Sequence, residues 1–322
     1  MAVERSYTAG MRQVVPVVKK DINDIKDFIS KLPEEDEARI WKSTGVYWEA
    51  LKSAREGALA RAERFFQVVL SMLPLAKMTR ESRFVALNLI KPVESYIRYK
   101  QNDYQQARAL MEEALSYSNV LRDEFGYEDI DARRVHLACN LMRLESRSGE
   151  IRRAARMGFQ LLHYVEGDGE SWPLTNLAAA TNDVQIPPHL RTVGFTQAAW
   201  ELALLFANEG KASQAVAVEE GERVAAQRRA EPTHQIESLA LWTGAKRALA
   251  EGDPAAFLAQ ASLFYDEGLA TPILWIALAT DTCRVCDEEG GGRARSLRKA
   301  ITDHLGTHKK FQQLMSTYEH AP

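Results

Sequence analysis

The chain of 322 residues has little of several features that would assign it to a class at once. It contains three cysteines, which are too few for a disulfide framework and fit a reducing compartment. Its formal net charge is −3, so no strong field of one sign favours nucleic acid or an anionic membrane as the partner. The first fifteen residues lack the apolar core and small-residue cleavage site of a secretory signal. We therefore expect a cytoplasmic protein, with neither nucleic acid nor a membrane among its partners.

Long apolar runs and reaction motifs are also missing. The longest apolar run, GLATPILWIALAT at 268–280, is shorter than the roughly 20 residues that span a bilayer. It predicts a buried helix instead. No H-E-x-x-H, G-x-S-x-G, phosphate-loop or dinucleotide motif occurs. Catalysis is left uncertain, a non-enzyme is favoured, and no catalytic residue and no cofactor are predicted.

Helical periodicity is what the sequence has in abundance. Between 16 and 33, apolar residues fall three or four apart and so share one helix face: Val18, Ile22, Ile25, Phe28 and Leu32. Similar patterns continue almost to the end of the chain, where they predict one last helix over 293–316. Alternating strand patterns are absent. The predicted fold class is all-α.

A repeat is visible within these helical patterns. In GALARAERFFQVVLSMLP at 57–74, a glycine turn is followed five residues later by Ala62, then by Phe66, and the stretch ends at Pro74. Ala50 lies twelve residues before Ala62 in the preceding helix. Small residues at such positions let two helix backbones approach closely. The same five-residue spacing recurs at Asn102 and Ala107, Gly149 and Ala154, Gly210 and Ala215, and Gly252 and Phe257.

This pattern resembles the tetratricopeptide (TPR) repeat over most of residues 36–266. The resemblance implies a right-handed α-solenoid of antiparallel helical hairpins. The repeat length departs from the family, because the intervals between Ala62, Ala107, Ala154, Ala215 and Phe257 are 45, 47, 61 and 42 residues. A regular TPR array keeps a period of 34. The repeats are therefore degenerate, and the chain is best described as TPR-like.

The resemblance implies a function in binding. TPR-like arrays bind peptides or protein segments in a groove lined by the first helix of each hairpin, which predicts a non-catalytic adaptor, scaffold or regulator. Aromatic and arginine side chains are favoured at such interfaces. A homodimer is left open. The groove positions carried over from the family are Tyr47, Tyr96, Tyr99, His136, Arg143, Trp200, Trp242 and Lys246.

The expected organisation has five parts. Residues 1–33 form an N-terminal helix, and 34–165 form the first hairpins. Residues 166–190, rich in glycine, proline and turn formers, form a linker or a lid. Residues 191–286 form the second hairpins, and 287–322 form a C-terminal capping helix.

Two alternatives stay open. Cys283, Cys286, His304 and His308 follow a C-x2-C-x17-H-x3-H spacing close to that of a zinc finger, so a zinc-stapled helical protein is one alternative. Helical periodicity around both cysteines favours buried helix residues instead. The other alternative is an all-α biosynthetic enzyme with a pocket under the 166–190 loop, lined by Trp172 and His189.

Overall fold

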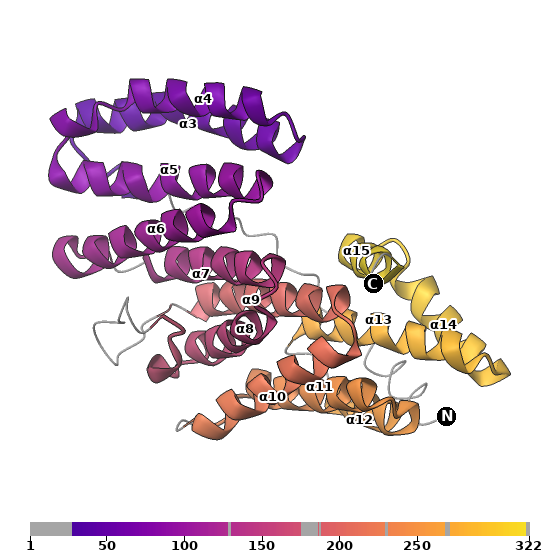
Figure 1. Cartoon of the computed structure of the whole chain (residues 1–322). Helices are drawn as coiled ribbons and strands as arrows, with labels where there is room; N and C mark the ends of the chain where they lie inside the picture. The colour runs from indigo at the N-terminus through magenta and orange to yellow at the C-terminus, as the bar shows by residue number, and fades with distance from the viewer. Residues whose placement is uncertain are drawn as a thin grey trace. The chain divides into compact units, whose positions relative to one another are not determined.

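The computed structural model describes residues 28–127, 130–174, 186, 188–228, 231–267 and 271–319. Within these ranges the chain contains no strand and forms thirteen α-helices, which pack in neighbouring pairs (Figure 1). The predicted all-α fold class is therefore confirmed. The helix expected over 1–33 lies outside the described residues except for its last six positions. Residue contacts divide the chain into two units, each described here by itself.

The N-terminal unit covers the described part of 20–148 and 174–190. Its helices are α3 (Glu34–Arg55), α4 (Leu59–Met72), the short η1 (Leu75–Lys77), α5 (Arg80–Lys100), α6 (Tyr104–Phe125) and α7 (Ile130–Arg147). Helix α3 pairs with α4 and α5 with α6, while α3 also packs against α5 and α6 against α7. Their facing sides bury a core that includes Ile40, Ala50, Ala62, Phe66 and Val93.

Local sequence explains where these helices begin. Four acidic residues, 34–37, occupy the first turn of α3, where negative charge is favoured by the helix dipole. The hydroxyl of Thr79 accepts a hydrogen bond from the Ser82 amide at the start of α5. The carboxylate of Asp103 accepts one from the Gln106 amide at the start of α6. Such side-chain caps satisfy amides that the first helical turn leaves free.

The five predicted turns all lie between consecutive helices. Gly57, Gly149 and Gly252 have φ angles of 79°, 85° and 75°, and Asn102 has a φ of 62°. Asparagine is among the few residues other than glycine that adopt this left-handed conformation at modest cost. Gly210 differs, because it stands with a φ of −70° as the N-cap of the following helix. The turn prediction is confirmed at all five positions.

The C-terminal unit covers the described part of 149–173 and 191–322. Its elements are α8 (Ile151–Val165), the short η2 (Gly169–Ser171), α9 (Pro188–Asn208), α10 (Lys211–Gln227), α11 (His234–Glu251), α12 (Pro254–Glu267), α13 (Pro272–Glu289), α14 (Gly292–Leu305) and α15 (Lys309–Glu319). Close packing joins α8 to α10, α11 to α12, and α13 to both α14 and α15.

Ion pairs and a close contact at a glycine hold α8 against α10. The buried carboxylate of Glu220 on α10 receives hydrogen bonds from Arg152 and Arg156 of α8, each at 2.8 Å. Burial alone would raise the pKa of Glu220, but these arginines outweigh it and lower the pKa to about 2. The next residue, Gly221, faces the Phe159 ring so closely that a Cβ atom would lie 2.5 Å from it.

Two local predictions are wrong. The single helix expected over 293–316 is interrupted at Gly306, and α14 and α15 are separate helices. Glycine and β-branched threonine are weak helix formers, so Gly306 and Thr307 favour a break. Ala215 was expected at a close helix crossing, as found for Ala62, Ala107 and Ala154, which are fully buried. It is only partly buried, because the amide of Gln214 is turned inward instead.

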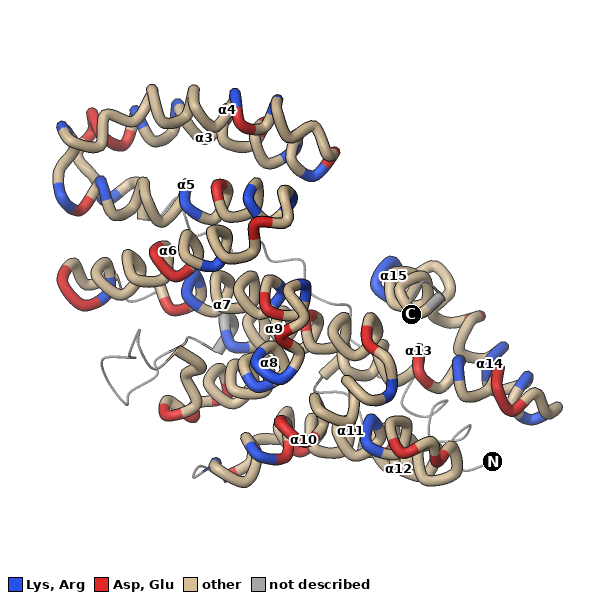
Figure 2. Tube along the Cα trace, viewed as in Figure 1, with Lys and Arg blue, Asp and Glu red and all other residues tan. Residues whose placement is uncertain are grey.

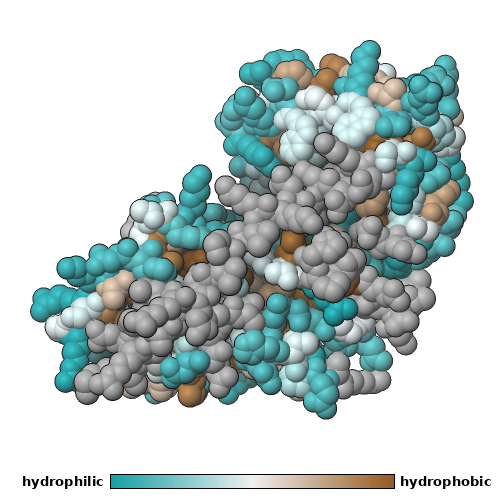
Figure 3. Space-filling view, turned by 180° about the vertical axis from the view of Figure 1, so that it is seen from behind, coloured by the Kyte–Doolittle hydropathy of each residue, from teal (hydrophilic) through white to brown (hydrophobic). Residues whose placement is uncertain are grey.

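Charged and hydrophilic side chains are common on the described surface. Charges of both signs occur on the helices of each unit (Figure 2). On the face seen from behind, hydrophilic side chains cover most of the described surface and hydrophobic ones appear in small areas (Figure 3). Among the described residues, none of the helices combines the length and the apolar character needed to cross a bilayer.

Candidate functional site

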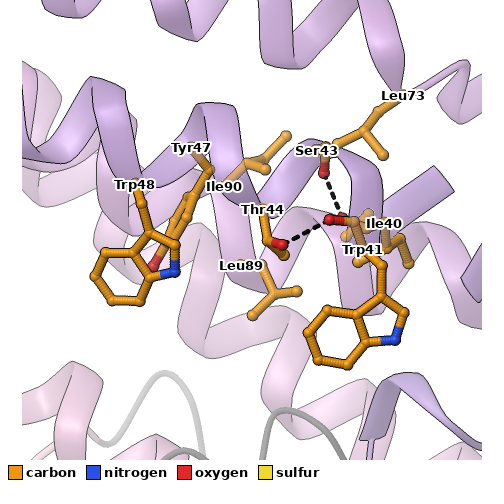
Figure 4. Close-up of a pocket in the computed structure, with 10 residues that line it drawn as sticks. Ile40, Trp41, Ser43, Thr44, Tyr47, Trp48, Leu73, Leu89 and Ile90 are labelled. Atoms are coloured by element: carbon orange, nitrogen blue, oxygen red, sulfur yellow. Dashed lines mark hydrogen bonds between the residues drawn. The ribbon is translucent and has the colours of Figure 1, made fainter. Parts of the chain in front are cut away.

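An apolar pocket of about 160 Å³ lies between α3 and α5 in the N-terminal unit (Figure 4). Side chains on one side of α3 form part of its wall. Helix α5 and Leu73, the C-cap residue of α4, form the rest. The lining residues are Ile40, Trp41, Ser43, Thr44, Tyr47, Trp48, Leu73, Ala86, Leu89 and Ile90.

Two tryptophans form the rim of this pocket. Trp41 and Trp48 stand seven residues apart on α3, so their side chains leave the same face of the helix about 10 Å apart along its axis. Their indole rings lie at opposite sides of the pocket (Figure 4). Trp41 is 36% exposed and Trp48 is 46% exposed, and both are among the few large hydrophobic residues that are exposed. An aromatic pair of this kind offers contact area that the fold itself does not use.

The polar side chains between the tryptophans are already satisfied. Ser43 donates to the Ile40 carbonyl at 2.7 Å, and Thr44 donates to the Trp41 carbonyl at 2.6 Å (Figure 4). Because both hydroxyl protons are used within α3, the pocket floor offers few donors to a ligand. The pocket is therefore suited to apolar groups.

A buried polar cluster joins α7 to α5 in the same unit. Arg133 of α7 donates from Nε to Asn88 Oδ1 at 3.2 Å and from Nη2 to the Asn88 carbonyl at 3.1 Å. Burial lowers the pKa of Arg133. Burial also raises the pKa of Tyr47, and the positive charges of Arg133 and Arg55 only partly offset this. Tyr47 thus belongs both to the pocket and to the surroundings of a buried cation.

The predicted groove residues of α5 and α7 form two further groups. Tyr96 and Tyr99 are partly buried, with ring centroids 5.7 Å apart, and Tyr104 lies 6.0 Å from Tyr99. On α7, Arg143 donates to Asn140 at 3.4 Å, and the Asn140 amide lies 3.2 Å from His136 Nε2. These residues are partly exposed and could contribute to a binding surface of the N-terminal unit.

The predicted groove residues of the C-terminal unit are differently placed. Trp200 is partly buried, and the Lys310 ammonium of α15 covers its ring at 3.9 Å. Trp242 is 0% exposed and Lys246 is 1% exposed. Neither of these two lines an open surface, because Tyr318 of α15 packs against Lys246 and Phe206 of α9 packs against Trp242. The expectation that Trp242 and Lys246 line an open groove is therefore wrong.

The four residues with zinc-finger spacing are not gathered. Cys283 and Cys286 are buried on α13, and burial raises the pKa of their thiols to about 12 and about 11. His304 lies on α14 against the Trp275 ring, and His308 lies between α14 and α15. Among the described residues, no three His, Cys, Asp or Glu side chains are grouped to hold a metal ion.

The loop that the enzyme alternative requires falls largely outside the described residues, which omit 175–185 and 187. The side chain of His189 is also outside them. Trp172 is buried, with its ring 4.8 Å from that of Tyr164. It packs in the C-terminal unit as a core residue.

Sequence reasoning missed both rim tryptophans. Of the residues of α3 that line the pocket, the family template pointed only to Tyr47. The sequence did hold a signal for them. Trp41, Thr44 and Trp48 have the i, i+3, i+7 spacing that places side chains on one face of a helix, and this face lies beside the buried residues Ile40 and Ser43. Comparison with family models, with curated proteins and with solved structures gives no match for this chain.

Proposed function

We propose that this protein is a non-catalytic adaptor or regulator that binds a peptide or protein segment, and that the pocket between α3 and α5 is the main contact. The observation that carries this proposal is the apolar pocket between two partly exposed tryptophans. Buried aromatic anchors dominate the energetics of most protein interfaces. At about 160 Å³ the pocket is smaller than the roughly 300–1,000 Å³ typical of drug-sized ligands. It suits one or two apolar side chains of a segment.

The same proposal includes a TPR-like arrangement of the helix pairs. Ser95 of α5 donates to the Ala107 carbonyl of α6 at 2.7 Å, at the twelve-residue spacing of the repeat. In such an array α3, α5 and α7 would present one binding face, on which Tyr47, Tyr96, Tyr99, His136 and Arg143 would extend the site beyond the pocket.

Peptide display on the full-length protein tests this function. Peptides enriched from a random library should bind W41A and W48A at least roughly tenfold more weakly than the parent protein. The melting temperature should change little, because both side chains are partly exposed. V68A is the matched control, since Val68 is 45% exposed on α4 and lies outside the pocket.

Two outcomes would contradict the proposal. One is that peptide binding is unaffected by W41A and W48A. The other is that W48A converts a dimer into a monomer in sedimentation, since the occupant of the pocket would then be a second copy of the chain.

A further inference from the structure

Helix α15 docks on the C-terminal unit through one row of side chains. Phe311, Leu314 and Tyr318 stand at i, i+3 and i+7, so they share one face of the helix. Phe311 is 3% exposed and Leu314 is 1% exposed, whereas Gln312 and Ser316 on the other side of α15 are exposed. An amphipathic helix that binds in a groove of another protein uses its side chains in the same one-sided way.

Polar contacts join α15 to three other helices of the unit. The Lys310 ammonium covers the ring of Trp200 on α9 at 3.9 Å. The Lys246 ammonium of α11 donates to the Tyr318 hydroxyl at 3.2 Å, and this hydroxyl donates to Asp281 of α13. The surface under α15 therefore recognises a basic residue before the apolar row and a tyrosine at its end.

The tyrosine end of α15 is incompletely packed. A cavity of about 260 Å³ has Tyr318, Asp281 and Arg284 in its wall. Atoms that border a cavity lack packing partners, so their separation loses less dispersion attraction. Tyr318 also covers the buried pair of Lys246 and Asp281, and the desolvation of such a pair offsets much of what its contacts contribute. Both features reduce the net free energy that holds α15 in its place.

The connection between α14 and α15 favours movement of α15 as a unit. Helix α14 ends at Leu305 and α15 begins at Lys309, so three residues that include Gly306 join them. Helix α15 has 11 residues and packs most closely against α13. Isolated helices shorter than about 12–15 residues are marginal in water, so α15 depends on the surface on which it docks.

We infer that α15 is a displaceable cover of a helix-binding surface, and that this surface takes an amphipathic helix of a partner protein. The partner helix carries an aromatic residue, an apolar residue three positions later and a tyrosine seven positions later, because this is the row that the surface already fits. Trp200, Lys246, Asp281 and Arg284 are its contacts. The inference concerns the C-terminal unit and does not depend on the pocket between α3 and α5.

A synthetic peptide with the sequence of residues 309–319, KKFQQLMSTYE, tests the inference on the full-length protein. The unlabelled peptide is titrated into isotope-labelled protein, and the NMR signals of α15 are followed. They should move toward undocked positions as the peptide reaches several millimolar, because a tethered helix competes at an effective concentration of roughly millimolar. The same peptide with the changes L314D and Y318A should leave them in place.

A full-length variant removes the competition by the chain's own helix. L314D should undock α15 and bind the labelled peptide at least roughly tenfold more tightly than the parent protein, as measured by fluorescence anisotropy. Q313D is the matched control, since it adds the same charge at an exposed position of α15 and should bind as the parent does. If L314D fails to fold, the titration of the parent protein still decides.

Three outcomes would overturn the inference. The first is that the α15 signals of the parent protein stay in place at the highest peptide concentration, or move equally with the altered peptide. The second is that folded L314D and the parent protein bind the peptide equally well. The third is a parent dimer that L314D converts into a monomer, since the occupant would then be α15 of a second copy. Peptide display with W41A and W48A decides the proposed function independently, because both tryptophans lie in the other unit.

Discussion

The ammonium group of Lys246 on α11 lies 2.5 Å from the carboxylate of Asp281 on α13, and both side chains are almost completely buried. The hydroxyl of Tyr318 on α15 also donates to Asp281. The rings of Phe206 and Trp242 lie 5.2 and 5.3 Å from the ammonium, so that a charged pair sits within an aromatic enclosure. This pair links three helices of the C-terminal unit.

Removal of one partner from this pair should be strongly destabilising. We expect K246M to lower the free energy of unfolding by about 3–5 kcal/mol, because Asp281 would keep a buried charge without compensation. The double variant K246M/D281L should be much closer to the parent protein, since no unpaired charge remains. Denaturant unfolding followed by circular dichroism measures both values.

The matched control for this experiment is the neighbouring residue Arg247. It forms an exposed ion pair with Glu222, and exposed pairs contribute at most about 1 kcal/mol. R247M should therefore change stability little. If K246M/D281L proves as unstable as K246M, the loss comes from the packing around the pair and not from the unpaired charge.

The burial of Lys246 shows which features of the fold could be predicted from the sequence and which could not. The turn at Asn102 and the buried alanines at 62, 107 and 154 were predictable, because left-handed turns and small residues at helix crossings are properties of a short stretch of chain. The burial of Lys246 was not, since it depends on Tyr318, which lies 72 residues further along the chain.

The candidate site shows the same limit. Adjacent arginines at 133 and 134 look equivalent in sequence, but α5 places only Asn88 beside the first, whereas Asp131 reaches the second. Which of the two arginines is paired with a carboxylate depends on the packing of α7 against its neighbours. Tyr47 could be predicted from the repeat, whereas the pocket beside it required the structure.

A second prediction concerns the contact between α10 and α8. G221A should destabilise the protein by about 1–3 kcal/mol, because the new methyl group would overlap the buried Phe159 ring. The variant F159L makes room, so G221A should cost less in the F159L background than in the parent protein. A double-mutant cycle from denaturant unfolding measures this difference.

Gly45 supplies the control for the glycine substitution. It lies exposed within α3, and a Cβ atom there would meet nothing within 4 Å. G45A should stabilise the protein by about 0.5–1 kcal/mol through helix propensity alone. Equal effects of G221A in both backgrounds would show that Phe159 does not limit the approach of the two helices.

A third prediction concerns His163 of α8, which is 2% exposed. Burial, with the nearby charge of Arg228, lowers its pKa from the ordinary 6.5 to about 4. The unfolded chain therefore takes up a proton near pH 6.5, whereas the folded protein resists protonation until about pH 4. Stability contributed by the neutral imidazole is complete above about pH 6.5 and is lost as the pH falls toward about 4, by about 2–3 kcal/mol.

Replacement of this histidine should flatten the acid limb of the stability curve. Between about pH 7 and pH 4.5, H163L should lose about 2 kcal/mol less than the parent protein does, because a leucine side chain takes up no proton in either state. H234L, which removes an exposed histidine of α11, is the control for the loss of a histidine side chain as such. Glu220 does not contribute to the change in this pH range. Its pKa is lowered from 4.5 to about 2, so the stability that its carboxylate contributes is lost only between pH 4.5 and about 2. Parallel pH curves for H163L and the parent protein would show that His163 is not the group responsible.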